Sequence, residues 1–195
     1  VAILSTGDEV VAPEQHPTPG QVRDVNSYTL AALVEAAGGQ AYRLGIFPDR
    51  FEALLSAAQK AHAESDVVLV TAGSSVSTRD LTARVIERLG PPGVVVHGVA
   101  IKPGKPTVLA VCQGIPVVGL PGNPVSALVI ARVFVVPLLS RLLGQTEDRA
   151  QPSARARLTT NVASETGRED YQPVRLVPGG DGWRAEPIYG RSNLI

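Results

Sequence analysis

Short apolar runs alternate with segments of helical periodicity along the first 144 residues. Strand-like runs cover residues 1–5, 41–47 and 66–73, and the third is apolar almost throughout, which is typical of a strand buried on both faces. The segments between these runs have apolar residues at i, i+3, i+4 and i+7, a spacing that predicts amphipathic helices. The clearest example is Leu30, Leu33, Val34 and Ala37. Asn26 or Ser27 is the expected cap of that helix.

The alternation continues after residue 73. A helix carrying Leu81, Val85 and Leu89 precedes three more strand-like runs, at residues 94–101, 107–111 and 116–120. A long apolar helix is then predicted from Pro124 to Leu143, with Asn123 as its cap and proline in its first turn. Strands that alternate with helices are typical of a parallel sheet with crossover helices. The sequence therefore predicts an α/β fold: three layers, with a mostly parallel sheet and helices on both faces.

The pattern changes beyond Gly144. A polar linker covers residues 145–154, and the segments after it are short, alternating and rich in turn residues. This pattern predicts a small β unit with a thin core, whose single tryptophan is Trp183. We therefore expect two parts, an α/β domain at residues 1–144 and a linker with a partial small β domain at 145–195.

Charge and composition narrow the range of partners. The chain has 18 basic and 18 acidic residues and no basic cluster, so neither nucleic acid nor an anionic membrane surface is an expected partner. Arg132 and Pro137 interrupt the Pro124–Leu143 segment, which we interpret as a buried or dimer-facing helix rather than a membrane span. The sole cysteine, Cys112, lies in a predicted strand and is interpreted as core filler. No export signal is recognised at the start, so a cytoplasmic location is expected. The chain opens in mid-strand without methionine, and we expect it to be a piece of a longer protein.

Polar residues collect where the predicted strands end. In open α/β sheets ligands bind beyond the carboxyl ends of the strands. The segments at those ends are Ser5–Glu9, Pro48–Asp49, Gly73–Ser77, Lys102–Lys105 and Pro121–Pro124. Lysines and a helix N-terminus favour a phosphate or another oxyanion. Carboxylates beside a phosphate require a divalent cation or a hydrogen-bonding heterocycle between them. The combination points to a phosphorylated heterocyclic ligand with a metal ion.

Each acidic residue also has a structural interpretation. Asp8 and Glu9 could serve only to form a turn, and Asp49 and Asp80 could serve only at helix starts, where the helix dipole favours carboxylates. The three histidines, His16, His62 and His97, share no metal-ligand spacing. No nucleophile motif and no Gly-x4-Gly-Lys-Ser/Thr loop occurs.

The order of five motifs carries a more specific signal. They are STGDE at 5–9, VRDVNSYTLAALVEAAG at 22–38, DVVLVTAGSSVSTRD at 66–80, AIKPGKP at 100–106 and GLPGNPVSA at 119–127. With these motifs in this order, the chain resembles the molybdopterin molybdenumtransferase family, which includes MoeA and the gephyrin E domain. The resemblance extends over residues 1 to about 144, and more loosely to the end. It implies the molybdopterin-binding fold.

The resemblance also implies an activity and a set of residues. Members of this family take adenylylated molybdopterin and molybdate, hydrolyse the adenylate and leave molybdenum on the dithiolene, assisted by Mg²⁺. Matched motif by motif, Glu9, Asp49 and Asp80 correspond to the acidic residues of the catalytic and metal site. The implied ligand-binding residues are Ser75, Lys102, Lys105, Pro121, Gly122, Asn123, Pro124 and Ser126. The family also implies a homodimer, with pterin and molybdate as the small-molecule partners.

The sequence departs from the family pattern at a few positions. The usual Gly-Gly-Val/Thr-Ser of the family appears here as residues 72–75, AGSS, and Ser77 stands where a glycine is expected. Gly98 stands where relatives often carry a basic residue. The family has two further domains before this one, so we expect the present chain to be inactive alone. Two alternatives stay open: a non-catalytic scaffold of the same fold, and a sister enzyme that processes nucleotides.

Overall fold

The computed structural model describes residues 1–72, 76–145 and 153–189, with the backbone alone for residues 76–79. Its main element is a six-stranded sheet in the order β4-β1-β5-β9-β8-β6. The strands are β1 Ala2–Thr6, β4 Tyr42–Phe47, β5 Val68–Thr71, β6 Pro92–His97, β8 Val108–Cys112 and β9 Ile115–Leu120. The pairings of β4, β1, β5 and β9 are parallel, whereas β8 is antiparallel to both β9 and β6. The sheet is therefore mostly parallel, as predicted.

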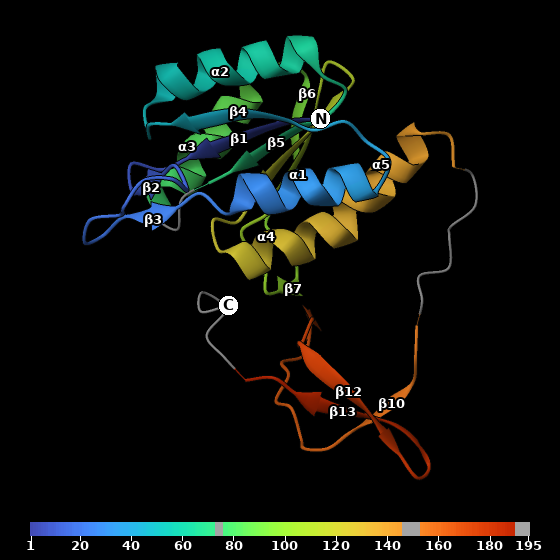
Figure 1. Ribbon diagram of the computed structural model, residues 1–195. Helices are drawn as coiled ribbons and strands as arrows, with labels where there is room; N and C mark the ends of the chain where they lie inside the picture. Colours follow the sequence, from blue (N-terminus) through green and yellow to red (C-terminus); the bar gives the residue numbers. More distant parts are fainter. Residues whose placement is uncertain (73–75, 146–152, 190–195) are drawn as a thin grey trace.

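Helices cover both faces of this sheet (Figure 1). On one face α2 (Phe51–Glu64) and α3 (Val76–Glu87) enclose a core that includes Leu54, Val85 and Ile86. On the other face α1 (Asn26–Ala36), α4 (Pro124–Ile130) and α5 (Val136–Leu142) enclose a second core. The strands between them alternate their side chains, since Leu4 and Val70 face the first core and Ile3 and Leu69 the second. The predicted three-layer α/β fold is confirmed.

The start of α1 differs from the prediction. Neither Asn26 nor Ser27 caps the helix, because Asn26 is already its first residue. Asp24 takes this role instead, accepting a hydrogen bond of 3.1 Å at Oδ1 from the Ser27 backbone N–H. A carboxylate there satisfies an amide that has no partner within the helix.

The long C-terminal helix of the domain has a wider turn in its middle. Between α4 and α5 the chain forms a π-helical turn, Ala131–Val135, in which the Val136 N–H donates to the Ala131 carbonyl. Pro137 gives a physical reason, since it has no N–H and its ring would clash with the carbonyl four residues earlier. The predicted single helix is thus continuous but not uniform.

This helix is also apolar enough to resemble a membrane span. By length and composition alone, residues Pro124–Leu142 could cross a membrane, and about a third of the most apolar stretch is buried inside the protein. Ala127, Ile130 and Val135 are fully buried in the second core, and the helix packs against α1 and β9. Its buried side therefore belongs to the core of the α/β unit.

A small sheet in the order β10-β13-β12 forms the C-terminal part. Its strands are β10 Ala156–Leu158, β12 Val174–Gly179 and β13 Gly182–Pro187. Of residues 153–189, only Ala185 is buried, so the core is as thin as predicted. The division of the chain into domains at residue 144 stays a prediction.

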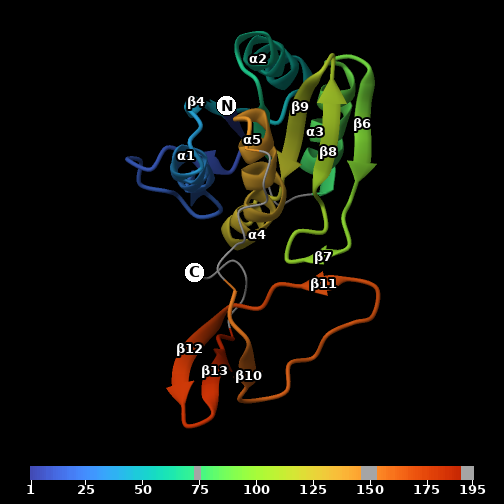
Figure 2. The same ribbon diagram turned by 90° about the vertical axis from the view of Figure 1, so that its right-hand side faces the viewer.

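Two short ladders complete the described fold. One joins β2 (Val10–Val11) to β3 (Val22–Arg23). The other joins β7 (Ile101–Lys102) to β11 (Glu169–Asp170), so that the C-terminal segment pairs with the α/β unit (Figure 2).

Candidate functional site

The candidate site lies at the sheet edge where the parallel strands end. β1, β4, β5 and β9 all run toward this edge, and β8 begins there because it runs the opposite way, Val108 pairing with Gly119. The KPGKP turn precedes β8 and the PGNP turn follows β9. Two turns that stand on either side of a hairpin in the sequence therefore lie at the same edge of the sheet.

The KPGKP turn packs directly on helix α4. Gly104 is buried with a φ of +133°, and a Cβ built on it would lie 2.5 Å from Ile130 Cγ1 and closer still to Cδ1. Both the backbone conformation and the contact require glycine here. This close approach holds the turn against the last residue of α4, while Lys102 and Lys105 on either side of Gly104 are exposed.

The PGNP turn forms the start of α4. Asn123 is the N-cap, and its Oδ1 accepts a hydrogen bond of 3.4 Å from the Ser126 backbone N–H. Pro124 is the first helical residue, as predicted. Pro121 and Ser126 are buried, whereas Gly122, Asn123 and Pro124 are half-buried.

The turn after β1 brings two aspartates together. Thr6, buried at the end of β1, donates from Oγ1 to Asp49 Oδ1 at 2.8 Å. The Asp49 backbone N–H donates to Asp8 Oδ1 at 3.1 Å. Asp49 lies just beyond β4, one residue before the N-cap of α2, and the Arg50 side chain at that N-cap makes no capping hydrogen bond. The Thr6 hydroxyl at the end of β1 holds the Asp49 carboxylate at the sheet edge where a ligand is expected.

Glu9 belongs to the same turn but is held differently. Gly7 adopts a φ of +147°, and a Cβ built there would lie 2.7 Å from Glu9 Oε2. The glutamate side chain therefore folds back over the glycine, which a larger residue would prevent.

The remaining predicted residues are less closely joined. Asp80 is exposed on α3, and no hydrogen bond or ion pair links it to Glu9 or Asp49 in the described part of the chain. Ser75 lies outside the described residues, as does Ser74, and the side chain of Ser77 is not described. Over the described residues, no three histidine, cysteine, aspartate or glutamate side chains gather closely enough to hold a metal ion. The metal role of Glu9, Asp49 and Asp80 stays a prediction.

Gly98 has a backbone reason for its departure from the family pattern. Its φ is +92°, and its N–H donates to the Thr107 carbonyl at 2.8 Å. A residue with a side chain would be strained in this conformation. Glycine at this position therefore allows the backbone turn beside the KPGKP segment, where a basic residue would be strained.

Sequence reasoning missed a buried polar chain beneath the edge. Thr71 Oγ1 donates to Ser5 Oγ at 3.2 Å, and Ser5 Oγ donates to Asp24 Oδ2 at 2.9 Å. All three side chains are buried. They connect the ends of β5 and β1 with the start of α1. Asp24 lies in one of the quoted motifs, but its spacing alone does not reveal a partner on β1.

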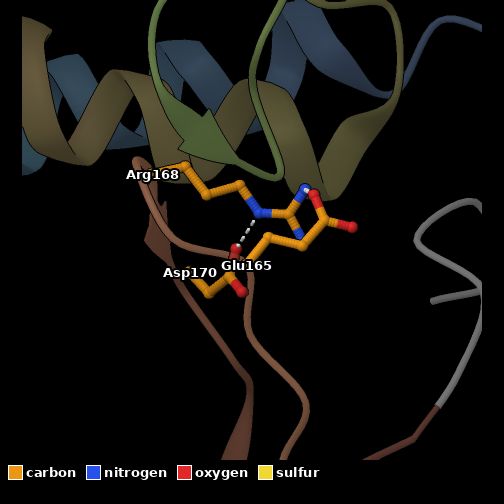
Figure 3. Close-up of polar contacts among 3 residues, drawn as sticks. All are labelled: Glu165, Arg168 and Asp170. Carbon is orange, nitrogen blue, oxygen red and sulfur yellow. Dashed lines mark hydrogen bonds and ion pairs between the residues drawn. The ribbon is translucent and has the colours of Figure 1, made fainter.

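The C-terminal segment also reaches the site. Glu169 N–H donates to the Ala100 carbonyl and Tyr171 N–H to the Lys102 carbonyl, at 2.8 and 2.7 Å. Between them Asp170 pairs in register with Lys102. The Arg168 guanidinium bonds Asp170 at 2.8 Å and Glu165 at 2.6 Å (Figure 3). A hydrogen bond from Ser164 and the nearby Arg168 and Lys102 charges lower the pKa of Asp170. A carboxylate from a distant segment thus stands beside a predicted anion-binding lysine.

Cys112 takes no part in this edge. It lies at the far end of β8, fully buried, with its thiol donating to the Ile86 carbonyl at 3.3 Å. Burial raises the pKa of the thiol, which disfavours the reactive thiolate. The structure agrees with its interpretation as core filler.

Taken together, fold and edge define an open α/β protein with a candidate ligand site beyond the carboxyl ends of its parallel strands. A family model described as "Probable molybdopterin binding domain" matches residues 2–141. The chain belongs to this molybdopterin-binding domain family.

Relatives carry more specific names. The chain is 37% identical over 172 residues to a molybdopterin molybdenumtransferase of Haemophilus influenzae, and 36% identical over 184 residues to one of a Nostoc species. These matches cover 88% and 92% of this chain but 42% of each relative. A crystal structure of a molybdopterin biosynthesis MoeA protein from Pyrococcus horikosii superposes with a TM-score of 0.82 at 41% identity, covering 97% of this chain and 44% of that one. The resemblance to molybdenumtransferases is confirmed, and the chain spans less than half the length of these relatives.

Proposed function

We propose that this chain forms the molybdopterin-binding part of an enzyme of molybdenum cofactor biosynthesis. The reaction is the insertion of molybdenum from molybdate into adenylylated molybdopterin, with hydrolysis of the adenylate and release of AMP. The observation that carries the proposal is that the KPGKP turn, which packs on Ile130 of α4, and the PGNP turn at the start of α4 lie at the same edge of the sheet. Relatives with the name molybdopterin molybdenumtransferase support the choice of substrate.

The KPGKP and PGNP turns are the proposed anion-binding elements. Lys102 and Lys105 are exposed on either side of Gly104. Their ammonium groups can therefore neutralise the charge of a bound phosphate or molybdate. Asn123 and Pro124 form the adjacent surface at the start of α4, and Ser126 lies buried in the first turn of that helix. Ser75, Pro121, Gly122 and Ser126 are further ligand-binding residues of the proposal.

The carboxylates at the sheet edge are the proposed groups that position water and transfer protons. Asp49 is oriented by the Thr6 hydroxyl, and an oriented carboxylate at the ligand edge can position a water molecule and accept its proton. Glu9 and Asp80 complete the proposed catalytic set. An alternative in which the fold is only a scaffold would leave no need for a buried threonine that orients Asp49.

Mg²⁺ is a separate part of the proposal. The described residues do not gather three metal-ligating side chains, so the protein would supply only part of the ligand shell of the ion. Mg²⁺ commonly takes one or two carboxylates and completes its shell with substrate phosphate oxygens and water. We propose Glu9, Asp49 and Asp80 as the source of those carboxylates, with the ion serving to neutralise phosphate charge once substrate is bound.

The assembly and location are proposed on narrower grounds. Leu142 and Leu143 are half exposed at the end of the apolar helix, which supports a homodimer as the functional state. Sedimentation that shows only monomer at high concentration would contradict it. The neutral net charge supports a protein without nucleic-acid or anionic-membrane partners, and the biosynthetic relatives support the proposed cytoplasmic location.

Two measurements test the function. Calorimetric titration of this chain with molybdate and with a pterin phosphate should show binding, and binding of pyridine nucleotide alone would favour the sister enzyme. Turnover is followed as AMP release from adenylylated molybdopterin with molybdate and Mg²⁺. Because catalysis needs reacting groups held to within about 1 Å, we expect release to require the segments that relatives carry beyond this chain. Binding of none of the ligands would favour the scaffold.

A further inference from the structure

The side chain of Asn26 connects the start of α1 to the PGNP turn. Its Nδ2 donates to the Gly122 carbonyl at 2.9 Å, across 96 residues of sequence. Asn26 is 8% exposed, and α1 and α4 lie side by side (Figure 1). This hydrogen bond therefore holds the peptide between Gly122 and the α4 cap from the side of a different helix.

The other half of the Asn26 amide has no such partner. Oδ1 is buried and accepts no hydrogen bond in the structure as described. Leaving a buried acceptor unsatisfied costs free energy, and a side chain of similar shape without polar atoms would avoid that cost. The residue is thus not explained by packing alone, and its N–H donor toward Gly122 is the remaining structural reason for an amide.

A buried hydrogen-bond network at the start of α1 fixes the position of Asn26. Asp24 accepts from Ser5 Oγ at one oxygen and from the Ser27 N–H at the other, at 2.9 and 3.1 Å. Ser5 in turn accepts from Thr71 at the end of β5. Because these groups are buried and hydrogen-bonded to one another, the first turn of α1 cannot shift without breaking them. Asn26 is therefore a donor on a rigid support.

We propose that Asn26 is a positioning residue of the candidate site, acting through Gly122 rather than on the ligand. It sets the direction of the Gly122–Asn123 peptide, and thereby the ligand-facing surface at the start of α4, relative to the ends of β1 and β5. The inference rests on the proposed function, since it assigns a task to a residue within the same site. Its signature is a loss of ligand binding without a loss of stability, because the free energy gained by removing the unsatisfied Oδ1 offsets the loss of the donor to the half-buried Gly122 carbonyl.

The test compares Asn26→Leu with Thr29→Ala in the full chain. Leucine keeps the approximate shape and removes both polar atoms. Thr29 lies on the same helix, and among the described residues its hydroxyl bonds the nearby Val25 and Asn26 carbonyls, so this variant is a matched control. We expect Asn26→Leu to bind molybdate at least about fivefold more weakly, as the loss of one hydrogen bond suggests. We expect its melting temperature to be unchanged or higher, and Thr29→Ala to keep wild-type affinity.

A second readout does not need a ligand. Amide hydrogen exchange over residues 119–127, and the amide resonance of Asn123, should change in Asn26→Leu and not in Thr29→Ala. Unchanged exchange and resonance would overturn the inference, as would unchanged molybdate affinity in a wild type that binds. If wild type fails to bind molybdate or pterin while the exchange changes as expected, the proposed function fails and the positioning of the turn by Asn26 stands.

Discussion

The contact between Gly104 and Ile130 offers the sharpest test of the site's construction. In Gly104→Ala the new methyl group would meet the Ile130 side chain at 2.5 Å or less, and the residue would keep a φ of +133°. Overpacking costs about 1–3 kcal/mol, and a strained backbone of this kind adds about 1–3 kcal/mol. The expected destabilisation is therefore about 2–6 kcal/mol. For a domain of this size each kcal/mol lowers the melting temperature by about 2–4 °C.

A control and a double-mutant cycle separate the two causes. Gly114 also has positive φ, +85°, but a Cβ there would meet nothing within 4 Å, so Gly114→Ala should cost only about 1–2 kcal/mol. Ile130→Ala alone should cost about 2–5 kcal/mol because it leaves a cavity. In the double variant the alanine at 104 fills part of that cavity. The double variant should therefore be less destabilised than the sum of the two single variants by about 1 kcal/mol or more.

The assay is chemical unfolding of the wild type and the four variants, followed by circular dichroism. Additivity to within about 0.5 kcal/mol would show that the two positions do not interact and would refute the packing argument. A destabilisation of Gly104→Ala no larger than that of Gly114→Ala would refute it as well. Titration of folded Gly104→Ala with molybdate then shows whether displacing the turn also weakens anion binding.

Three further predictions concern charge at the same edge. Lys102→Ala and Lys105→Ala should each weaken molybdate binding in calorimetry while stability changes by roughly 0.5 kcal/mol or less, and unchanged affinity in both would make the turn purely structural. Because the pKa of Asp170 is lowered when folded, its contribution is present at neutral pH and is lost as pH falls below 3.8. Melting at pH 5 and pH 3 should show a larger loss for wild type than for Asp170→Asn. Thr6→Val should slow AMP release roughly tenfold in a catalytically complete chain with little change in melting temperature, and an unchanged rate would show that Asp49 needs no orientation.

Much of the fold could be predicted because its signals are local. The helical spacing that includes Leu30 and Val34 and the apolar run before Thr71 each have a period set by their own backbone geometry. The π-helical turn was missed, although Pro137 inside an apolar helix is a signal for a disturbed backbone. The cap at Asp24 was missed by two residues, because several capping residues stand together in the segment DVNS.

The sequence predicted which turns contribute to the candidate site but not the contacts between their side chains. The motifs identify the lysines and the PGNP segment, but the link between Thr6 and Asp49 joins residues 43 positions apart. No sequence motif indicates the hydrogen-bond partner of Asn26 or the carboxylate partners of Arg168. The β7–β11 ladder consists of two-residue strands, too short to show any hydrophobic periodicity.

The sequence by itself determined the order of strands and helices, the apolar faces and the chemistry of the turns, since each depends on residues within a few positions of one another. Only the tertiary structure decided that β8 runs against its neighbour, so that KPGKP and PGNP meet at one edge, and that Asn26 and Asp170 reach those turns from elsewhere. Strand direction and long-range pairing follow from contacts between residues far apart in the chain, and no local pattern of side chains encodes which distant partner will satisfy a given polar group.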